Sequence, residues 1–104
     1  MALADTSNIT GSSVIDRDGE RVGKASDVIY DDRDLQPRWL VVEFGSLRKH
    51  HTAVPFDRLY LSDTGDVVVE SDRDAIHHAP RIAGAPLLPS DEVELETYFH
   101  GGRR

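Results

Sequence analysis

Residues 14–24 constrain the fold more than any other stretch of this 104-residue chain. Two short β-prone runs flank an Asp-Gly pair, in which Gly19 can adopt the positive φ that a tight hairpin turn requires. In the second run Val22 and Ala25 are out of phase, and Gly23 lies where a β-bulge would restore the alternation. A bulged, bending strand predicts a small, strongly curved sheet. The feature therefore indicates an architecture rather than a catalytic reaction.

Further short apolar runs extend this pattern, and the clearest of them is residues 38–44. Leu40 and Phe44 lie on the face of this strand that we expect to point into the core. The opposite face carries Trp39 and Val41, so it is apolar enough to need a cover. The strands predicted along the chain are residues 14–16, 21–31, 38–44, 51–55, 60–62 and 67–70. The sequence thus predicts a mainly β protein, a small closed or partly open β-barrel of about six short antiparallel strands.

Helical patterns replace the strands after residue 70. Ser71 is the expected N-cap of a short helix over residues 72–79, which a proline then ends. A second helix is expected to begin at Ser90 and to end near residues 101–102. Its expected apolar positions are Val93, Tyr98 and Phe99, with Leu95 intermediate.

We therefore divide the chain into three segments. Residues 1–10 are the expected flexible N-terminal lead-in, residues 11–82 form the barrel domain, and residues 83–104 form a C-terminal loop and helical arm.

Composition narrows the classes of function. The chain has no cysteine, which excludes disulfides, thiol catalysis and thiolate-bound metals. No apolar run is long enough to span a bilayer, and the N-terminus lacks the features of a signal peptide, so we expect a cytoplasmic protein. The net charge of −7 and the scattered basic residues disfavour nucleic acid as a partner, because nonspecific binding to phosphates depends on clustered cations.

The order of these motifs resembles the PRC-barrel family. Residues 16–28 follow the pattern D-x-D-G-E-x-V-G-K-x-x-D-V, and the similarity continues through residues 39–42, 54–55 and 79–80. The family's barrel occurs in the cytoplasmic part of the photosynthetic reaction centre H subunit and in the C-terminal domain of a ribosome-maturation factor. The end of the chain, at residues 98–101, is similar to that of free-standing bacterial members. The resemblance covers residues 11–82 and implies a docking or assembly module without a shared catalytic set.

Our first functional hypothesis is a non-catalytic interaction module, a homodimer that docks on a larger complex through an unidentified protein partner. The candidate interface residues are Trp39, Val41, Tyr98 and Phe99. Tryptophan is enriched in protein interfaces, but it can equally be a barrel-wall residue that the C-terminal helix covers. Trp39 has both roles if the helix of one chain covers the barrel of another, which would give a two-fold dimer.

The second hypothesis is a ribosome- or RNA-associated factor, by analogy with the maturation factor. Its local support is a possible basic patch of Arg38, Arg48, Lys49 and His50.

A third hypothesis is a metal-binding, pH-responsive or enzymatic protein. The adjacent pairs His50–His51 and His77–His78 do not have the spacing of a chelating pair, so we expect solvated histidines. Histidine titrates near neutral pH, which leaves a pH response open. No nucleophile elbow or phosphate-binding glycine loop is present, and the sequence predicts no catalytic residue, metal ligand or cofactor.

Overall fold

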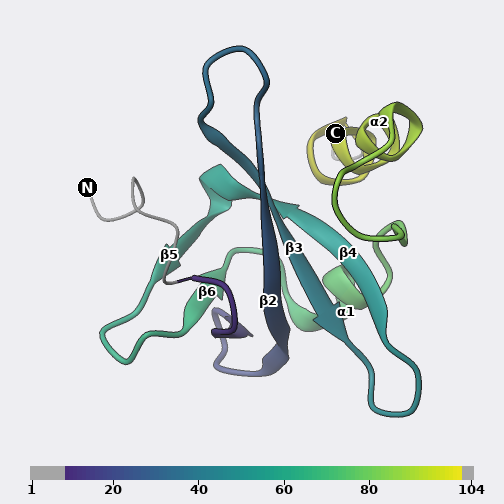
Figure 1. Cartoon of the computed structure of the whole chain (residues 1–104). Coiled ribbons are helices and arrows are strands. Elements are labelled where there is room, and N and C mark those ends of the chain that lie inside the picture. Colours follow the sequence, from purple (N-terminus) through teal and green to yellow (C-terminus); the bar gives the residue numbers. More distant parts are fainter. Residues whose placement is uncertain (1–8, 102–104) are drawn as a thin grey trace.

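The computed structural model describes residues 9–101, which form one six-stranded sheet with helices beside it (Figure 1). The strands are β1 (Ser13–Asp16), β2 (Arg21–Tyr30), β3 (Pro37–Phe44), β4 (His50–Pro55), β5 (Leu59–Leu61) and β6 (Val67–Val69). A 3₁₀ turn, η2 (Phe56–Arg58), joins β4 to β5. The predicted positions of the strands agree with these bounds to within one residue at each end.

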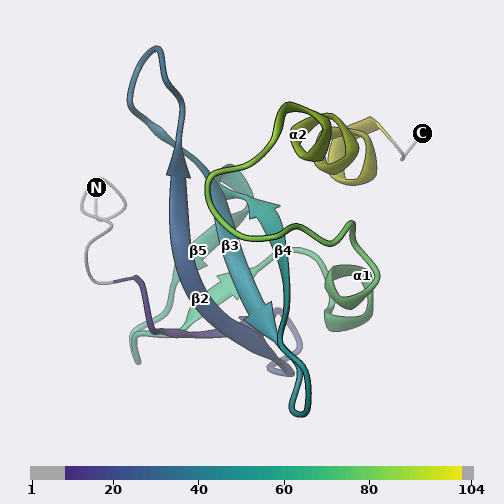
Figure 2. The ribbon, with the colours of Figure 1, turned by 45° about the vertical axis from the view of Figure 1, so that its right-hand side comes forward.

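The order of strands in the sheet is β4-β3-β2-β1-β6-β5. All neighbouring strands are antiparallel except β1 and β6, which are parallel, so the expectation of an entirely antiparallel sheet is wrong at this pair. No ladder joins β4 to β5 in the described part of the chain. The prediction of a mainly β, partly open barrel is therefore confirmed, and the strongly bent β2 gives the sheet its curvature (Figure 2).

Irregular pairing of β2 explains why its apolar residues are out of phase. Val14 pairs with Gly23 and Ile15 with Arg21, so Val22 is the extra residue on the β1 side. A second irregularity, at Ser26, lies on the side that faces β3. Because of these two shifts Val22 and Ala25 are both buried, as the expected bulge requires.

Gly23 has a separate role in bringing two strands together. A Cβ atom at this position would overlap the carbonyl oxygen of Glu43 on β3, which leaves no space for a side chain. Glycine thus permits the close approach of β2 to β3 at this point.

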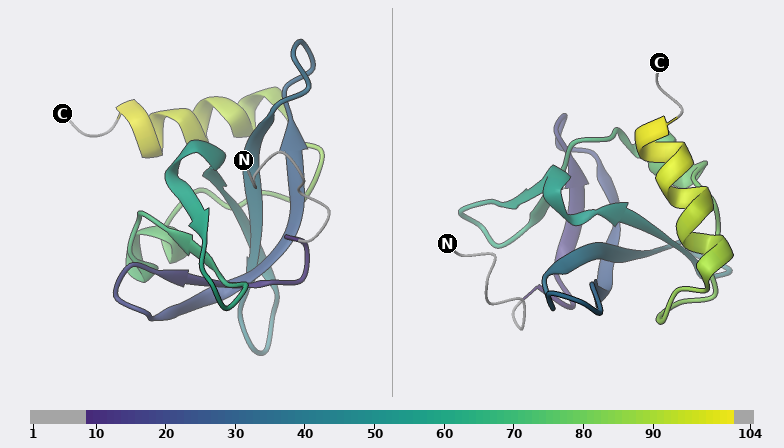
Figure 3. Two further views of the ribbon diagram at one scale, coloured as in Figure 1. Left: turned by 90° about the vertical axis from the view of Figure 1, so that its left-hand side faces the viewer. Right: turned by 90° about the horizontal axis from the view of Figure 1, so that it is seen from above.

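Both faces of β3 are buried. Trp39 and Val41 on one face and Leu40 and Val42 on the other are at most 1% exposed. The helix α2 (Pro89–Glu96) lies beside the sheet, and the π-helical turn η3 (Thr97–Gly101) continues directly from it (Figure 3). They contribute Leu95 to the core, so the expected cover of the outer face is present.

The helices begin and end at other residues than predicted. The first, α1, spans Arg73–His77, and its N-cap is Asp72 rather than Ser71. The carboxylate of Asp72 accepts a hydrogen bond of 2.8 Å from the Ala75 N–H, which is the bond that a capping side chain makes. In α2 the N-cap is Leu88 instead of Ser90.

The exposure of two apolar residues on α2 also differs from the prediction. Val93 is 65% exposed, whereas Leu95 is fully buried, although the sequence pattern favoured the reverse. Residues four apart lie on the same face of a helix, and Leu95 lies one turn before Phe99, the next buried position.

Most of the predicted lead-in, residues 1–8, lies outside the described residues, as do residues 102–104. Ile9, which the lead-in was expected to include, is buried in the core. The N–H of Gly11 donates a hydrogen bond of 2.7 Å to the carbonyl of Ala25, which ties this segment to β2. Within residues 9–101, none of the helices has the length and apolar character needed to cross a membrane.

Candidate docking surfaces

Arg38, at the start of β3, joins the sheet to the C-terminal arm. Its guanidinium lies 3.2 Å from a carboxylate oxygen of Asp31, 3.3 Å from one of Glu92 and 3.2 Å from one of Glu96. The same oxygen of Glu92 accepts a hydrogen bond of 3.5 Å from the Trp39 indole N–H. One arginine therefore holds three carboxylates from two distant segments, and these residues form the Arg38 cluster.

The Asp31 carboxylate of this cluster is stabilised in its charged form. The Arg33 N–H donates a hydrogen bond of 2.7 Å to it, and this bond lowers the pKa of Asp31 below its ordinary value. Burial opposes the shift, but the charges of Arg33 and Arg38 and the N–H of Asp34 add to it. Asp31 thus remains a carboxylate well into the acidic range.

The four residues of the candidate interface do not share an open surface. Trp39, Val41 and Phe99 are buried within the chain, and only Tyr98, at 37% exposure, reaches the surface. The hydroxyl of Tyr98 donates a hydrogen bond of 2.7 Å to the carbonyl of Ala75 in α1. In a single chain the apolar face of β3 is therefore covered by the chain's own arm.

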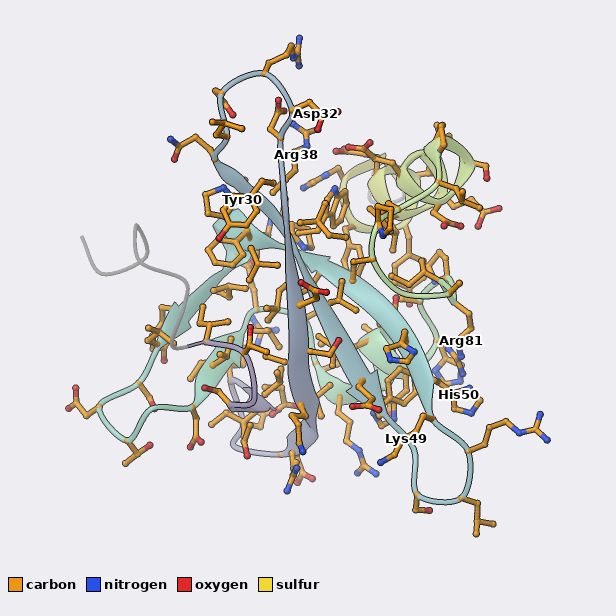
Figure 4. The ribbon with its side chains drawn as sticks, viewed as in Figure 1. Tyr30, Asp32, Arg38, Lys49, His50 and Arg81 are labelled. Carbon is orange, nitrogen blue, oxygen red and sulfur yellow. The ribbon has the colours of Figure 1, made fainter. Side chains whose placement is uncertain are left out.

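A groove of about 750 Å³ opens beside the Arg38 cluster. One wall is the end of β2, from Val28 to Tyr30, and the other is the loop over residues 85–87. Tyr30 is 44% exposed, and the acidic side chains at the edge are Asp31, Asp32 and Glu92. Figure 4 shows Tyr30, Asp32 and Arg38 at the same end of the molecule. No local motif could have marked this groove, because its walls come from segments far apart in the sequence.

The opposite end of β3 is built around the ring of Phe44. His77 from α1 stacks on this ring with a centroid distance of 4.3 Å and an interplanar angle of 9°. The guanidinium of Arg81 lies 5.0 Å from the ring centroid, and the His50 ring lies 5.6 Å from it. His77 also forms a hydrogen bond of 2.9 Å through Nε2 with the carbonyl oxygen of Val22. The expectation that His77 is simply solvated is therefore wrong.

Basic side chains gather around this end. Arg21, Lys24 and Lys49 line one hollow of about 230 Å³. His50 and Arg81 lie close to Lys49 in Figure 4. No acidic side chain among residues 9–101 forms an ion pair with Arg21, Lys24, Arg48, Lys49 or Arg81.

The predicted basic patch is thus divided. Arg48, Lys49 and His50 lie together at the turn between β3 and β4, but Arg38 lies at the far end of β3, in the cluster of carboxylates (Figure 4). Among the described residues, no group of three or more histidine or acidic side chains is arranged to hold a metal ion.

Asp16, the first aspartate of the family pattern, is a buried carboxylate. Its Oδ1 accepts hydrogen bonds from the N–H groups of Asp18 and Glu20, at 3.0 and 2.9 Å, and its Oδ2 accepts one from Arg73, at 3.0 Å. Burial raises the pKa of Asp16, but these three bonds together with the charge of Arg17 outweigh it, and the pKa is lowered. Asp16 therefore fastens the β1–β2 turn to the start of α1, which is a structural role.

Comparison with known families agrees with this architecture. The model of the PRC-barrel domain matches residues 3–76, which is more than half of the chain. A search of curated proteins gives no match. The matched segment contains the whole sheet and the start of α1, so the chain belongs to the PRC-barrel family.

Proposed function

We propose that this protein is a non-catalytic interaction module that holds a protein partner within a larger cytoplasmic assembly. PRC-barrel domains are generally non-catalytic, which favours binding over a reaction. The observation that carries the proposal is the groove between the end of β2 and residues 85–87. It combines apolar side chains with an acidic edge, which would complement a peptide segment that carries both apolar and basic side chains.

Charge favours a basic partner at this groove. Arg38 and Arg33 supply two positive charges against the carboxylates of Asp31, Glu92 and Glu96, so the cluster keeps an excess of one negative charge. Asp32 at the groove edge is exposed and has no ion pair among the described residues. A segment with a lysine or arginine beside an apolar side chain would match both the edge and the wall.

The proposal includes a homodimer. Because the arm already covers β3 in one chain, a dimer through the candidate interface residues requires that two chains exchange their arms. Residues 83–87 form no hydrogen bond with other described residues, so the exchange has to release the packing of Leu87 on the core but no hydrogen bond of the linker. Light scattering at micromolar concentration tests this part, and we expect twice the 11.6 kDa chain mass. A strict monomer would remove the dimer from the proposal but would leave the groove.

The groove itself is tested by affinity capture followed by a binding measurement. Tyr30→Ala and Asp32→Lys change exposed groove residues, and Tyr60→Ala and Asp63→Lys are matched exposed changes on and beside β5. We expect a specific protein to be captured by the wild type and by both controls and lost with both groove variants. Calorimetry with that purified protein is then expected to show a Kd at least about tenfold weaker for Asp32→Lys. Equal binding by all variants contradicts the groove as the docking site.

A further inference from the structure

The turn between β3 and β4 carries an unusual combination of side chains at its tip. Leu47 is fully exposed, more so than any other large apolar residue that the structure describes. The turn projects beyond the sheet at the end opposite the groove (Figures 1 and 4). Gly45, with φ +109°, allows the chain to fold back tightly, since a Cβ there would overlap the carbonyl oxygen of Arg48.

Unpaired cations surround this apolar tip. Arg48 and Lys49 follow Leu47 directly and are exposed, and the hollow lined by Lys49 brings Arg21 and Lys24 to the same side. Glu43 also lines this hollow, so three cations there face one carboxylate and the hollow keeps a positive excess. None of these four cations has an ion pair with a described acidic residue, although the chain as a whole is strongly acidic. We call Leu47 with these four cations the basic tip.

We infer that the basic tip binds the surface of an anionic lipid bilayer. Leu47 enters the boundary between headgroups and acyl chains, and the surrounding cations contact the lipid phosphates. An exposed apolar side chain and nearby lysines and arginines contribute together to binding of this kind, the first by burial and the others by electrostatic attraction. Both components are small for one leucine and a few cations, so the binding is reversible.

The convex shape of the tip favours a bilayer over other anionic partners. A nucleic acid would meet the cations but would leave Leu47 in water or against phosphates. An acidic protein would need a pocket for Leu47, whereas a bilayer accepts any protruding apolar side chain.

The distribution of charge also orients the molecule. The carboxylates of the Arg38 cluster lie at the other end of β3, so they point away from a surface that the basic tip contacts (Figure 4). The groove would then face the cytoplasm and stay open to a protein partner. The inference does not depend on that partner, because the two surfaces share no residue.

Co-sedimentation with vesicles tests the inference. The probes are vesicles of phosphatidylcholine alone and of phosphatidylcholine mixed with phosphatidylglycerol, at low and high salt. The variants are Leu47→Ser and the double change Arg48→Ala with Lys49→Ala. The matched controls are Leu35→Ser and Arg33→Ala in the exposed loop between β2 and β3. Intrinsic fluorescence of the buried Trp39 reports whether each variant stays folded.

We expect the wild type to sediment with the mixed vesicles at low salt and to be released at high salt. Each removed cation is expected to weaken partitioning by about fivefold, and Leu47→Ser by about tenfold, while the controls bind as the wild type does. Absence of binding to mixed vesicles at low salt overturns the inference, as does unchanged binding of folded Leu47→Ser. Retention on an RNA duplex or on polyglutamate without vesicle binding assigns the tip to nucleic acid or to an acidic protein and overturns it equally.

Discussion

The two ends of β3 use arginine in opposite ways. At one end Arg38 contacts three carboxylates and joins the sheet to the C-terminal arm. At the other end Arg81 lies over the ring of Phe44, donates hydrogen bonds to the carbonyls of His77 and Ala79, and has no carboxylate partner among the described residues. Both arginines therefore hold parts of the fold together, but neighbouring carboxylates neutralise the charge of Arg38, whereas the charge of Arg81 has no carboxylate partner among the described residues.

The largest effect is expected where the arm meets the sheet. Leu95 is fully buried on α2, and Leu95→Ala is expected to lower the free energy of unfolding by about 2–5 kcal/mol, because it removes buried methyl groups and leaves a cavity. Urea denaturation followed by circular dichroism measures the change.

The matched control lies on the same helix. Val93 is 65% exposed, and Val93→Ala is expected to change stability by less than about 0.5 kcal/mol. Equal losses in the two variants would show that the arm has a different register on β3.

The stability of the protein at the Phe44 end is expected to depend more on His77 than on His78. His77→Ala removes both the ring stacking on Phe44 and the hydrogen bond with the Val22 carbonyl, at an expected cost of about 1–2 kcal/mol. His78→Ala removes only a hydrogen bond with the exposed Asp74 carbonyl and is expected to cost less. Thermal denaturation at neutral pH compares the two, and a His77→Ala midpoint at the wild-type value would mean that this end tolerates loss of the stack.

A smaller effect is expected from the Arg38 cluster. Glu92→Gln weakens an ion pair whose side chains are about 40% exposed, so we expect a loss of only about 0.5–1 kcal/mol at low salt. Glu94→Gln, on the same helix and without an ion pair among the described residues, is expected to be close to neutral. Because salt screens exposed charges, the difference between the two variants should shrink at high salt. A difference that persists in high salt contradicts the electrostatic role.

How far the sequence predicts the structure differs between the sheet and the surfaces. The alternation of apolar residues, the Asp-Gly turn and the interrupted phase at Val22 and Ala25 were enough to place every strand and the bulge in β2. These signals are local, and the sheet follows from them. The parallel pairing of β1 with β6 was not predictable in this way, because it joins segments far apart in the chain.

The surfaces were less predictable for the same reason. The apolar face of β3 predicts the cover over Trp39, but the three carboxylates around Arg38 come from a loop and from α2, and no spacing rule connects them. Proximity in sequence predicts the basic group at residues 48–50, but the prediction that Arg38 lies beside it is wrong, because Arg38 is at the other end of β3. Alternating residues on a strand specify a face and not an end of the sheet.

The smallest expected effect concerns the pKa values of two carboxylates, Asp16 and Asp31, which lie at different ends of the sheet. Asp16 has its pKa lowered by three backbone N–H groups against the effect of burial, whereas Asp31 has its pKa lowered by the Arg33 N–H together with the charges of Arg33 and Arg38. For both groups the folded pKa lies below the ordinary value of 3.8, so each stabilises the fold above that pH. The stabilisation is lost as the pH falls through the folded pKa.

Salt should separate the two carboxylates. Added salt screens the arginine charges near the exposed Asp31 pairs but does not weaken backbone hydrogen bonds to the buried Asp16. Carboxyl ¹³C shifts followed by NMR through an acid titration are expected to show the pKa of Asp31 rising in high salt by the part that the charges of Arg33 and Arg38 contribute, while the Arg33 N–H still holds it below 3.8. The pKa of Asp16, on which only the charge of Arg17 acts, is expected to change less. Equal shifts of the two would mean that ion pairing, rather than the backbone amides, holds the Asp16 charge. In that case the two ends of the sheet would stabilise their carboxylates by the same means.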